Sequence, residues 1–283
     1  MQFLNGLVFS MLLFVMAAGL SLIFGQMNVI NLAHGSFYML GGYVGLSIVR
    51  EFESFWLALV VAPMIVGTLG IIIEYAFLRR LYGAHRHLDQ VLFTFGLALI
   101  AANLIRWHWG PYVVAVAAPS QLQGQVSFFG IQFPLYRLSI IAFGLTIAVL
   151  LWTFLERTRI GAIIRAGVSD ARMVSGLGIN IHLVFAGVFT LGSALAALAG
   201  VIGAPVHSLY PGLDFEILIL TLGVVVVGGL GTIKGAFFGS LLIGMADTFG
   251  KALLPEFALF LIFAVMAVIL MLRPSGLLGL QGR

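Results

Sequence analysis

Cysteine is absent from the 283-residue sequence, and charged residues are scarce, at 8% of the chain. The absence of cysteine excludes disulfides, thiol catalysis and cysteine-ligated metals. Soluble domains carry roughly 25% charged residues, so this chain has too few to cover a water-facing surface of its size. The two shortages together exclude a soluble globular enzyme.

Long apolar stretches occupy most of the chain instead. Apolar residues make up 61% of the sequence, and a membrane-crossing helix needs about 20 of them. The sequence therefore predicts an all-α polytopic membrane protein, a bundle of about eight or nine transmembrane helices forming a single transmembrane domain over residues 1–283. Three of the stretches are short enough to be tilted, broken or re-entrant. The stretches lie at 3–25, 28–49, 55–78, 91–105, 135–155, 182–204, 217–230, 237–250 and 257–272, and the short ones are 91–105, 217–230 and 237–250.

Sequence patterns for catalysis are missing as well. The sequence contains no His-Glu-x-x-His metal motif and no Gly-x4-Gly-Lys-Ser/Thr phosphate-binding loop. We therefore expect no catalytic residue, no metal and no cofactor on this chain, and any ATP must be hydrolysed by another chain. The net charge of +4 comes without a basic run or aromatic stacking pattern, so we expect no nucleic-acid partner.

The placement of arginine predicts an orientation. Arginines gather in two loops and after the last apolar stretch, and the positive-inside rule makes these places cytoplasmic. Threading the stretches through that constraint places the N-terminus outside and the C-terminus inside, with Lys234 on the inner side and the segments 106–134 and 205–216 facing out. The arginines are Arg79, Arg80 and Arg86 in the first loop, Arg157, Arg159, Arg165 and Arg172 in the second, and Arg273.

Two acidic residues within the apolar stretches are candidates for a proton pathway. Glu74 precedes Arg79 and Arg80, and Asp247 lies four residues before Lys251. Both spacings favour ion pairs near the ends of helices over a proton relay. The sequence places no carboxylate at mid-membrane.

The first polar feature inside the apolar stretches is a group of three residues at a spacing of three. Asn28, Asn31 and His34 would lie on one face if the segment were helical. Buried polar groups need partners, so the group either forms hydrogen bonds between helices or lines a pathway, and both interpretations stay open.

The second feature is a run of glycines at 228–239. Gly228 and Gly229 permit a turn or a broken helix, and Gly231, Gly235 and Gly239 are spaced for close helix packing. Packing explains such a run, but a discontinuous helix beside a pathway has the same pattern.

The third feature is the segment 156–178, which carries six charges within 17 residues. Its apolar residues at 160, 163, 164 and 168 recur at helical spacing, and Ser169 or Asp170 can cap the next segment of the chain. A short amphipathic helix would suit docking of a soluble partner, whereas an ordinary positive-inside loop explains only the arginines. The candidate coupling residues are Arg157, Arg159, Gly161, Arg165, Ser169, Asp170, Arg172 and Gly176.

Taken in order, these motifs resemble the LivH-type permease subunit of branched-chain amino acid ABC importers, over nearly the whole chain. The resemblance is carried by segments 19–25, 28–35, 38–41, Glu74 with 78–81, 94–97, 158–179, 195–200, 228–236 and 273–279. One position departs from the family pattern, because Ser36 follows His34-Gly35 where an acidic residue is common. Ser36 therefore joins Asn28, Asn31, His34, Gly228, Gly229 and Gly231 as candidate residues of the translocation pathway.

The resemblance implies a multi-pass subunit of a bacterial inner membrane, surrounded by lipid, that imports branched-chain or other hydrophobic amino acids. It implies four kinds of partner: a second related permease chain in a heterodimer, two cytoplasmic ATPase subunits that use the ATP, and an extracytoplasmic solute-binding protein. The alternatives are a permease for urea, short amides or another small polar solute, a stand-alone ion-coupled carrier or channel, and an intramembrane enzyme built around His34.

Overall fold

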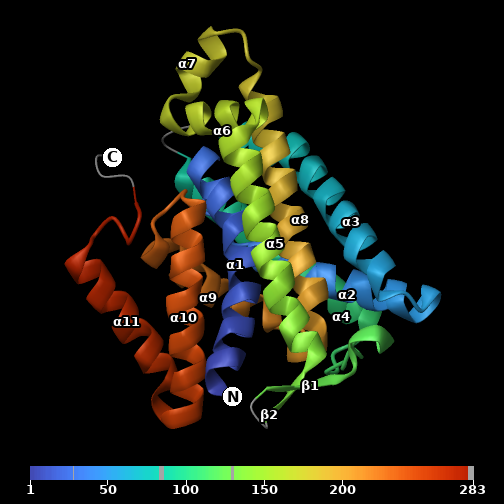
Figure 1. Ribbon diagram of the computed structural model, residues 1–283. Helices are drawn as coiled ribbons and strands as arrows, with labels where there is room; N and C mark the ends of the chain where they lie inside the picture. Colours follow the sequence, from blue (N-terminus) through green and yellow to red (C-terminus); the bar gives the residue numbers. More distant parts are fainter. Residues whose placement is uncertain (28, 83–85, 129–130, 280–283) are drawn as a thin grey trace.

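The computed structural model describes residues 1–27, 29–82, 86–128 and 131–279, and helices dominate it (Figure 1). Within the described residues, each of the nine predicted apolar stretches overlaps one long helix, which confirms the predicted all-α membrane fold. The long helices are α1 (Gln2–Met27), α2 (His34–Phe52), α3 (Phe55–Ala76), α4 (His87–Trp109), α5 (Leu135–Arg157), α8 (Ile181–His207), α9 (Leu213–Gly228), α10 (Ile233–Leu253) and α11 (Ala258–Leu272).

Short elements lie at the two ends of the bundle. Helices α6 (Arg159–Ser169) and α7 (Ala171–Gly176) stand at one end, and the N-terminus and an antiparallel hairpin lie at the other (Figure 1). The hairpin pairs β1 (Gln125–Phe128) with β2 (Ile131–Pro134). Single 3-10 turns, η1 (Leu78–Leu81), η2 (Ser120–Leu122) and η3 (Pro255–Phe257), complete the connections.

By length and composition, six helices of the described chain are able to cross a membrane: α1, α3, α4, α5, α8 and α11 with its preceding turn. The stretches 91–105 and 237–250 lie within longer helices than their apolar residues predict, because α4 has 23 residues and α10 has 21. Helix α9 is short, as expected, and is bounded by Gly212 and Gly229, both with positive φ. Positive φ is incompatible with a right-handed α-helix, so the glycines set both ends.

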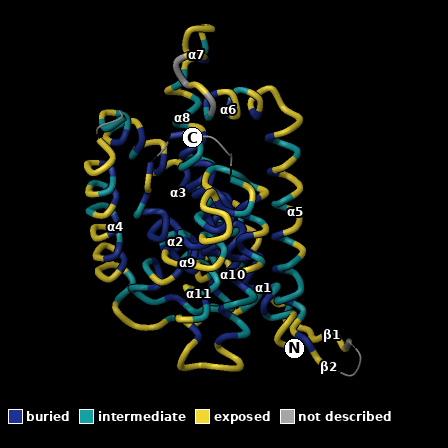
Figure 2. The backbone as a smooth tube through the Cα atoms, turned by 90° about the vertical axis from the view of Figure 1, so that its left-hand side faces the viewer, coloured by how far each residue is buried: buried dark blue, intermediate teal, exposed yellow. Residues whose placement is uncertain are grey.

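Helix α1 forms the centre of the bundle and contacts α5, α8, α9 and α10. It has no charged residue and is apolar on all sides, as a fully buried helix must be. Its serines satisfy their hydroxyls inside the protein, because Ser10 donates to the carbonyl of Leu241 in α10 and Ser21 to that of Thr232 just before α10. Figure 2 shows buried backbone at the middle of the bundle and exposed residues along α4 and α5 at its flanks.

Glycine allows the central helices to approach closely. A Cβ added at Gly19 would lie 2.6 Å from the carbonyl oxygen of Gly192, and one at Gly192 would lie 2.8 Å from that of Gly19. The contact between α1 and α8 is therefore backbone against backbone, the arrangement that small residues provide in membranes. By contrast, α3, α4, α5 and α11 expose large apolar side chains, which suits contact with lipid.

Candidate translocation and coupling site

Helix α2 begins about halfway through the bundle. His34, its first residue, places Nε2 3.0 Å from the carbonyl oxygen of Met16 in the middle of α1. At a rise of 1.5 Å per residue, Met16 lies about 21 Å from Gln2 and about 16 Å from Met27. Residues 29–33 lead from the end of α1 to this depth, and the Leu32 N–H donates to Thr94 Oγ1 of α4.

The helical face expected for Asn28, Asn31 and His34 does not form. Residues 29–31 are not helical and 32–33 form a turn, because the Asn31 side-chain oxygen accepts a hydrogen bond from the Ala33 N–H at 3.1 Å. Such local bonding competes with a helix. Asn31 and His34 are both fully buried, while Asn28 lies outside the described residues.

Ser36 meets a carboxylate that sequence reasoning missed. Its hydroxyl donates to Asp214 Oδ2 at 3.1 Å, and Asp214 is only 2% exposed. The predicted topology puts 205–216 in an outer segment, but α9 starts at Leu213 and carries Asp214 in its first turn. Two acidic residues shortly after a glycine are a signal for the first turn of a helix, and that signal could have located Asp214.

The polar group at the start of α2 consists of the buried side chains Asn31, His34 and Ser36, with Asp214 joined to Ser36. Three of its atoms, Asn31 Nδ2, His34 Nδ1 and Asp214 Oδ1, have no hydrogen-bond partner among the described residues. Buried polar atoms are nearly always paired, by protein or by water, so this group has capacity for water or another polar partner. The bonds it does make join α1, α2 and α9, as expected for hydrogen bonding between helices, and its role in the pathway stays a prediction.

The glycines at 228–231 make the turn that their sequence predicts. Gly228 ends α9, and Gly229 and Gly231 have φ of 107° and 78°, so both need glycine. Two amides of the C-terminal segment close the end of α9, because Leu277 and Leu278 donate to the carbonyls of Val227 and Gly228 at 2.8 and 3.0 Å. These bonds satisfy carbonyls that a helix end leaves free.

The glycine run also packs the next helix, as predicted. A Cβ at Gly239 would lie 2.6 Å from the Val224 carbonyl oxygen, and Gly235 lies against Gly228. Gly231 faces α1, where its added Cβ would come within 2.8 Å of the Gly25 Cα. The turn is therefore held between α1, α9 and α10 with no space for a larger residue.

The segment 156–178 forms two capped helices rather than a loop. The Thr158 hydroxyl accepts from the Gly161 N–H at 3.0 Å to start α6, and the Asp170 carboxylate accepts from the Met173 N–H at 2.9 Å to start α7. Of the two residues expected to cap the second helix, Asp170 does so. The side chains of Ser169 and Arg172 lie outside the described part of the chain.

The apolar face of α6 is turned only partly toward the bundle. Ile164 is 6% exposed, but Ile160 is 58% exposed. Gly161 packs against backbone carbonyls at the end of α5, Arg165 pairs with Glu156 at 3.7 Å, and Arg157 lies over the ring of Trp152. Gly176 ends α7, and nothing lies within 4 Å of a Cβ added there. Arg159 is exposed at the first position of α6.

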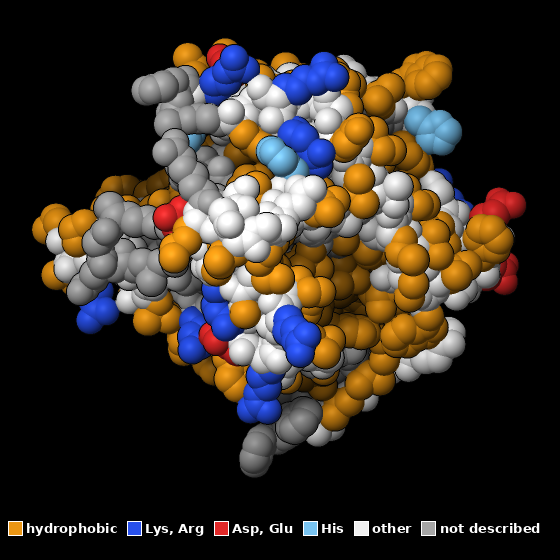
Figure 3. Space-filling model, turned by 90° about the horizontal axis from the view of Figure 1, so that it is seen from above, with side chains coloured by type: hydrophobic (Ala, Val, Ile, Leu, Met, Phe, Trp, Pro, Cys, Tyr) orange, Lys and Arg blue, Asp and Glu red, His pale blue; other side chains and the backbone are white. Residues whose placement is uncertain are grey.

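A cavity of about 470 Å³ brings the two predicted sets of residues together. Gly231 from the glycine turn and Arg165 from α6 line the same space, with Glu156 and Lys234 beside them. Its apolar wall comes from the ends of α1 and α5, including Leu22 and Trp152. Seen from this end, Lys and Arg side chains gather on the surface (Figure 3).

The two predicted ion pairs are confirmed. Glu74 is fully buried, receives Arg79 Nη2 at 3.0 Å and accepts a hydrogen bond from the Tyr82 hydroxyl at 2.8 Å. Burial, together with this bond to Glu74, raises the pKa of the Tyr82 phenol above its ordinary value. Asp247 pairs with Lys251 at 2.9 Å near the opposite end of the bundle.

Residues 2–270 match the family model described as the branched-chain amino acid transport system / permease component. The chain belongs to this family. As a member it is a multi-pass membrane permease component and not an enzyme, which confirms the family and the class predicted from the sequence.

Three relatives are similar in sequence to this permease over nearly its full length. The high-affinity branched-chain amino acid transport system permease protein BraD of Pseudomonas aeruginosa is 28% identical over 98% of this chain and 95% of its own. LivH of Escherichia coli K12 is 29% identical, over 98% and 94%. The probable branched-chain amino acid transport permease protein LivH of Methanocaldococcus jannaschii is 26% identical, over 98% and 91%.

A solved structure shares the fold. The permease superimposes on PsaBC from Streptococcus pneumoniae, determined in complex with a Fab, with a TM-score of 0.50 over 95% of this chain and 89% of that chain. The sequence identity is 13%, so the comparison bears on the arrangement of helices alone.

Proposed function

We propose that this permease forms half of the membrane pathway of an ATP-driven importer for branched-chain and other hydrophobic amino acids. The observation that carries the proposal is the cavity shared by Arg165 and Gly231, where α6 meets the turn between α9 and α10. The printed names of the three relatives, all branched-chain amino acid permeases, supply the solute class.

The charge distribution supports an orientation with α6 and α7 in the cytoplasm. The described cationic residues at that end outnumber those at the other, and the positive-inside rule then places the N-terminus outside and the C-terminus inside. Residues at the α6 end are Arg79, Arg80, Arg86, Arg157, Arg159, Arg165, Lys234 and Arg273, against Arg50, Arg106, Arg137 and Lys251 at the other.

The remaining parts of the importer must come from other chains. Because the sequence has no phosphate-binding loop, two cytoplasmic ATPase subunits would bind and hydrolyse ATP and dock on α6 and α7. A second related permease would complete the pathway, and an extracytoplasmic binding protein would deliver the solute. The buried group at 31, 34, 36 and 214 is closed within one chain, so opening would require movement between helices.

The proposal assigns the transmission of that movement to helix α6. It contacts α1, α5 and α8, and its capped first turn is joined to the end of α5 through Thr158 and Gly161. A shift of α6 caused by the ATPases would therefore move α5 and press on the turn at Gly231. Rigid-body motion of this kind is a common way for proteins to switch between two states.

The test is a double replacement in the helices proposed to dock the ATPases, Arg165→Gln in α6 with Asp170→Ala at the start of α7. In proteoliposomes that contain the complete importer, we expect ATP hydrolysis to continue while uptake of leucine falls, because the two are uncoupled. The matched control is Arg50→Gln, an exposed arginine at the opposite end of the bundle. Uptake that stays coupled in the double variant would contradict the docking role, and a solute panel with valine, urea and acetamide would test the solute class.

A further inference from the structure

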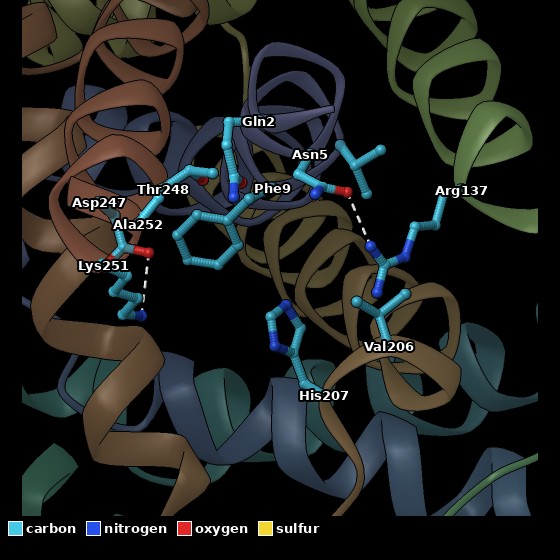
Figure 4. Close-up of a pocket in the computed structure, with 11 residues that line it drawn as sticks. Gln2, Asn5, Phe9, Arg137, Val206, His207, Asp247, Thr248, Lys251 and Ala252 are labelled. Carbon is cyan, nitrogen blue, oxygen red and sulfur yellow. Dashed lines mark hydrogen bonds and ion pairs between the residues drawn. The ribbon is translucent and has the colours of Figure 1, made fainter. Parts of the chain in front are cut away.

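A second cavity, of about 320 Å³, lies at the end of the bundle opposite α6 and α7. It is formed near the ends of four helices, by the beginnings of α1 and α5 and the final parts of α8 and α10 (Figure 4). Its volume is at the lower limit of the roughly 300–1,000 Å³ found for small-molecule sites. Neither the glycine turn nor the buried group around His34 contributes to it.

Arg137 supplies an anion-binding group on one side of this cavity. Its Nη1 donates to the Asn5 side-chain oxygen at 2.7 Å, and within the described residues no acidic group lies at ion-pair distance from it. A guanidinium has five N–H donors in a planar fork that matches a carboxylate with two parallel bonds. Arg137 therefore keeps donors for an incoming carboxylate.

Groups that suit a cation lie across the cavity from Arg137 (Figure 4). Asp247 is 4% exposed and is paired with Lys251, whose side chain is 58% exposed. An ion pair with so exposed a partner contributes little free energy, so an ammonium group can replace Lys251 at low cost. The ring of His207 points into the cavity between the two sides, and its buried Nε2 has no hydrogen-bond partner among the described residues.

Helix dipoles add to this separation of an anion-binding side from a cation-binding side. Asn5 and Arg137 lie in the first turns of α1 and α5, where the helix dipole is positive, and His207 is the last residue of α8, where it is negative. Phe9 lies between them, with its ring 5.4 Å from that of His207 and 5.7 Å from Lys251 Nζ. The cavity thus has a carboxylate side, an ammonium side and an apolar wall.

We propose that this cavity binds a zwitterionic α-amino acid on the permease itself. The carboxylate binds Arg137, the ammonium group binds Asp247 and His207, and an apolar side chain packs on Phe9. The inference rests on the proposed function for the identity of the solute. It adds an amino-acid-binding site at the outer mouth of the pathway, which binds the solute in the absence of the solute-binding protein.

The first test measures binding of radiolabelled L-leucine to the complete importer in lipid nanodiscs, with no solute-binding protein present. We expect saturable binding, which Arg137→Gln weakens about tenfold to a hundredfold, because a hydrogen-bonded charged pair is worth about 1.5–3 kcal/mol. Asp247→Asn should also weaken it, whereas the control Arg50→Gln should not. The proposal would be overturned if leucine showed no saturable binding, or if neither Arg137→Gln nor Asp247→Asn weakened it.

Two leucine analogues assign the two sides of the cavity. Isocaproate lacks the amino group and isoamylamine lacks the carboxylate, so each should bind the unaltered importer more weakly than leucine. Asp247→Asn should abolish the preference for leucine over isocaproate. Arg137→Gln should abolish the preference for leucine over isoamylamine. If Arg137→Gln does not assemble, Arg137→Lys keeps the charge but loses the two parallel bonds, and it should still bind leucine more weakly.

Uptake measurements separate this proposal from the proposed function. An importer that transports leucine with its binding protein, yet does not bind leucine without it, would refute the cavity and leave the function standing. An importer that binds leucine at this cavity but transports a different solute would refute the function and leave the cavity standing.

Discussion

Replacing Gly231 by alanine tests how tightly the turn between α9 and α10 is held. Gly231 has a φ of 78°, and an added Cβ would lie 2.8 Å from the Cα of Gly25. The left-handed backbone costs an L-residue about 1–2 kcal/mol, and overpacking costs about 1–3 kcal/mol. We therefore expect Gly231→Ala to lower the stability of the permease by about 2–5 kcal/mol, measured by tryptophan fluorescence during SDS unfolding in micelles.

Replacements of three other glycines separate the cost of the left-handed backbone from the cost of overpacking. Gly25→Ala meets the same contact from α1 without positive φ, and Gly178→Ala has a φ of 83° with nothing within 4 Å. Gly187→Ala has neither problem and sits inside α8, where alanine is about 1 kcal/mol better than glycine. A Gly231→Ala permease as stable as the Gly187→Ala permease would refute the close packing of the turn.

Two further replacements probe the buried polar contacts. Ser36→Ala leaves the Asp214 carboxylate without its hydroxyl donor, and we expect a loss of about 1–3 kcal/mol in the same unfolding assay; no loss would show that water replaces the hydroxyl freely. Glu74→Gln leaves the Arg79 guanidinium without an anionic partner, with an expected loss of about 1–3 kcal/mol. The expected loss is smaller than for a fully buried ion pair because Arg79 is 25% exposed. An unchanged midpoint of SDS unfolding would show that the pair contributes as little as a surface ion pair.

Periodicity and composition predicted the helices well, because apolar stretches of membrane length have few other solutions. The ion pairs of Glu74 and Asp247 were also predictable, since their partners lie within five residues along the chain. The turn at Gly229 followed from the conformational freedom of glycine.

The mid-depth contacts were not predictable in the same way. Ser36 and Asp214 are far apart in sequence, and a pattern along the chain carries no information about such a pair. Asn31 is not helical, because its side chain accepts a hydrogen bond from the Ala33 N–H, and this local turn competes with a helix. Contacts with Thr94 of α4 and Met16 of α1 favour the turn over the helix. Tertiary contacts therefore decide where α2 begins.

The closure of α9 by the C-terminal segment has a consequence for biogenesis. Because Leu277 and Leu278 supply the amides that complete the end of α9, this helix gains its last hydrogen bonds only after α10 and α11 have been synthesised. Synthesis must therefore have passed Leu278 before the glycine turn reaches its final form. Assembly with other subunits through this end of the bundle would then wait for this segment, and only chains that contain residues 277 and 278 would present a finished surface.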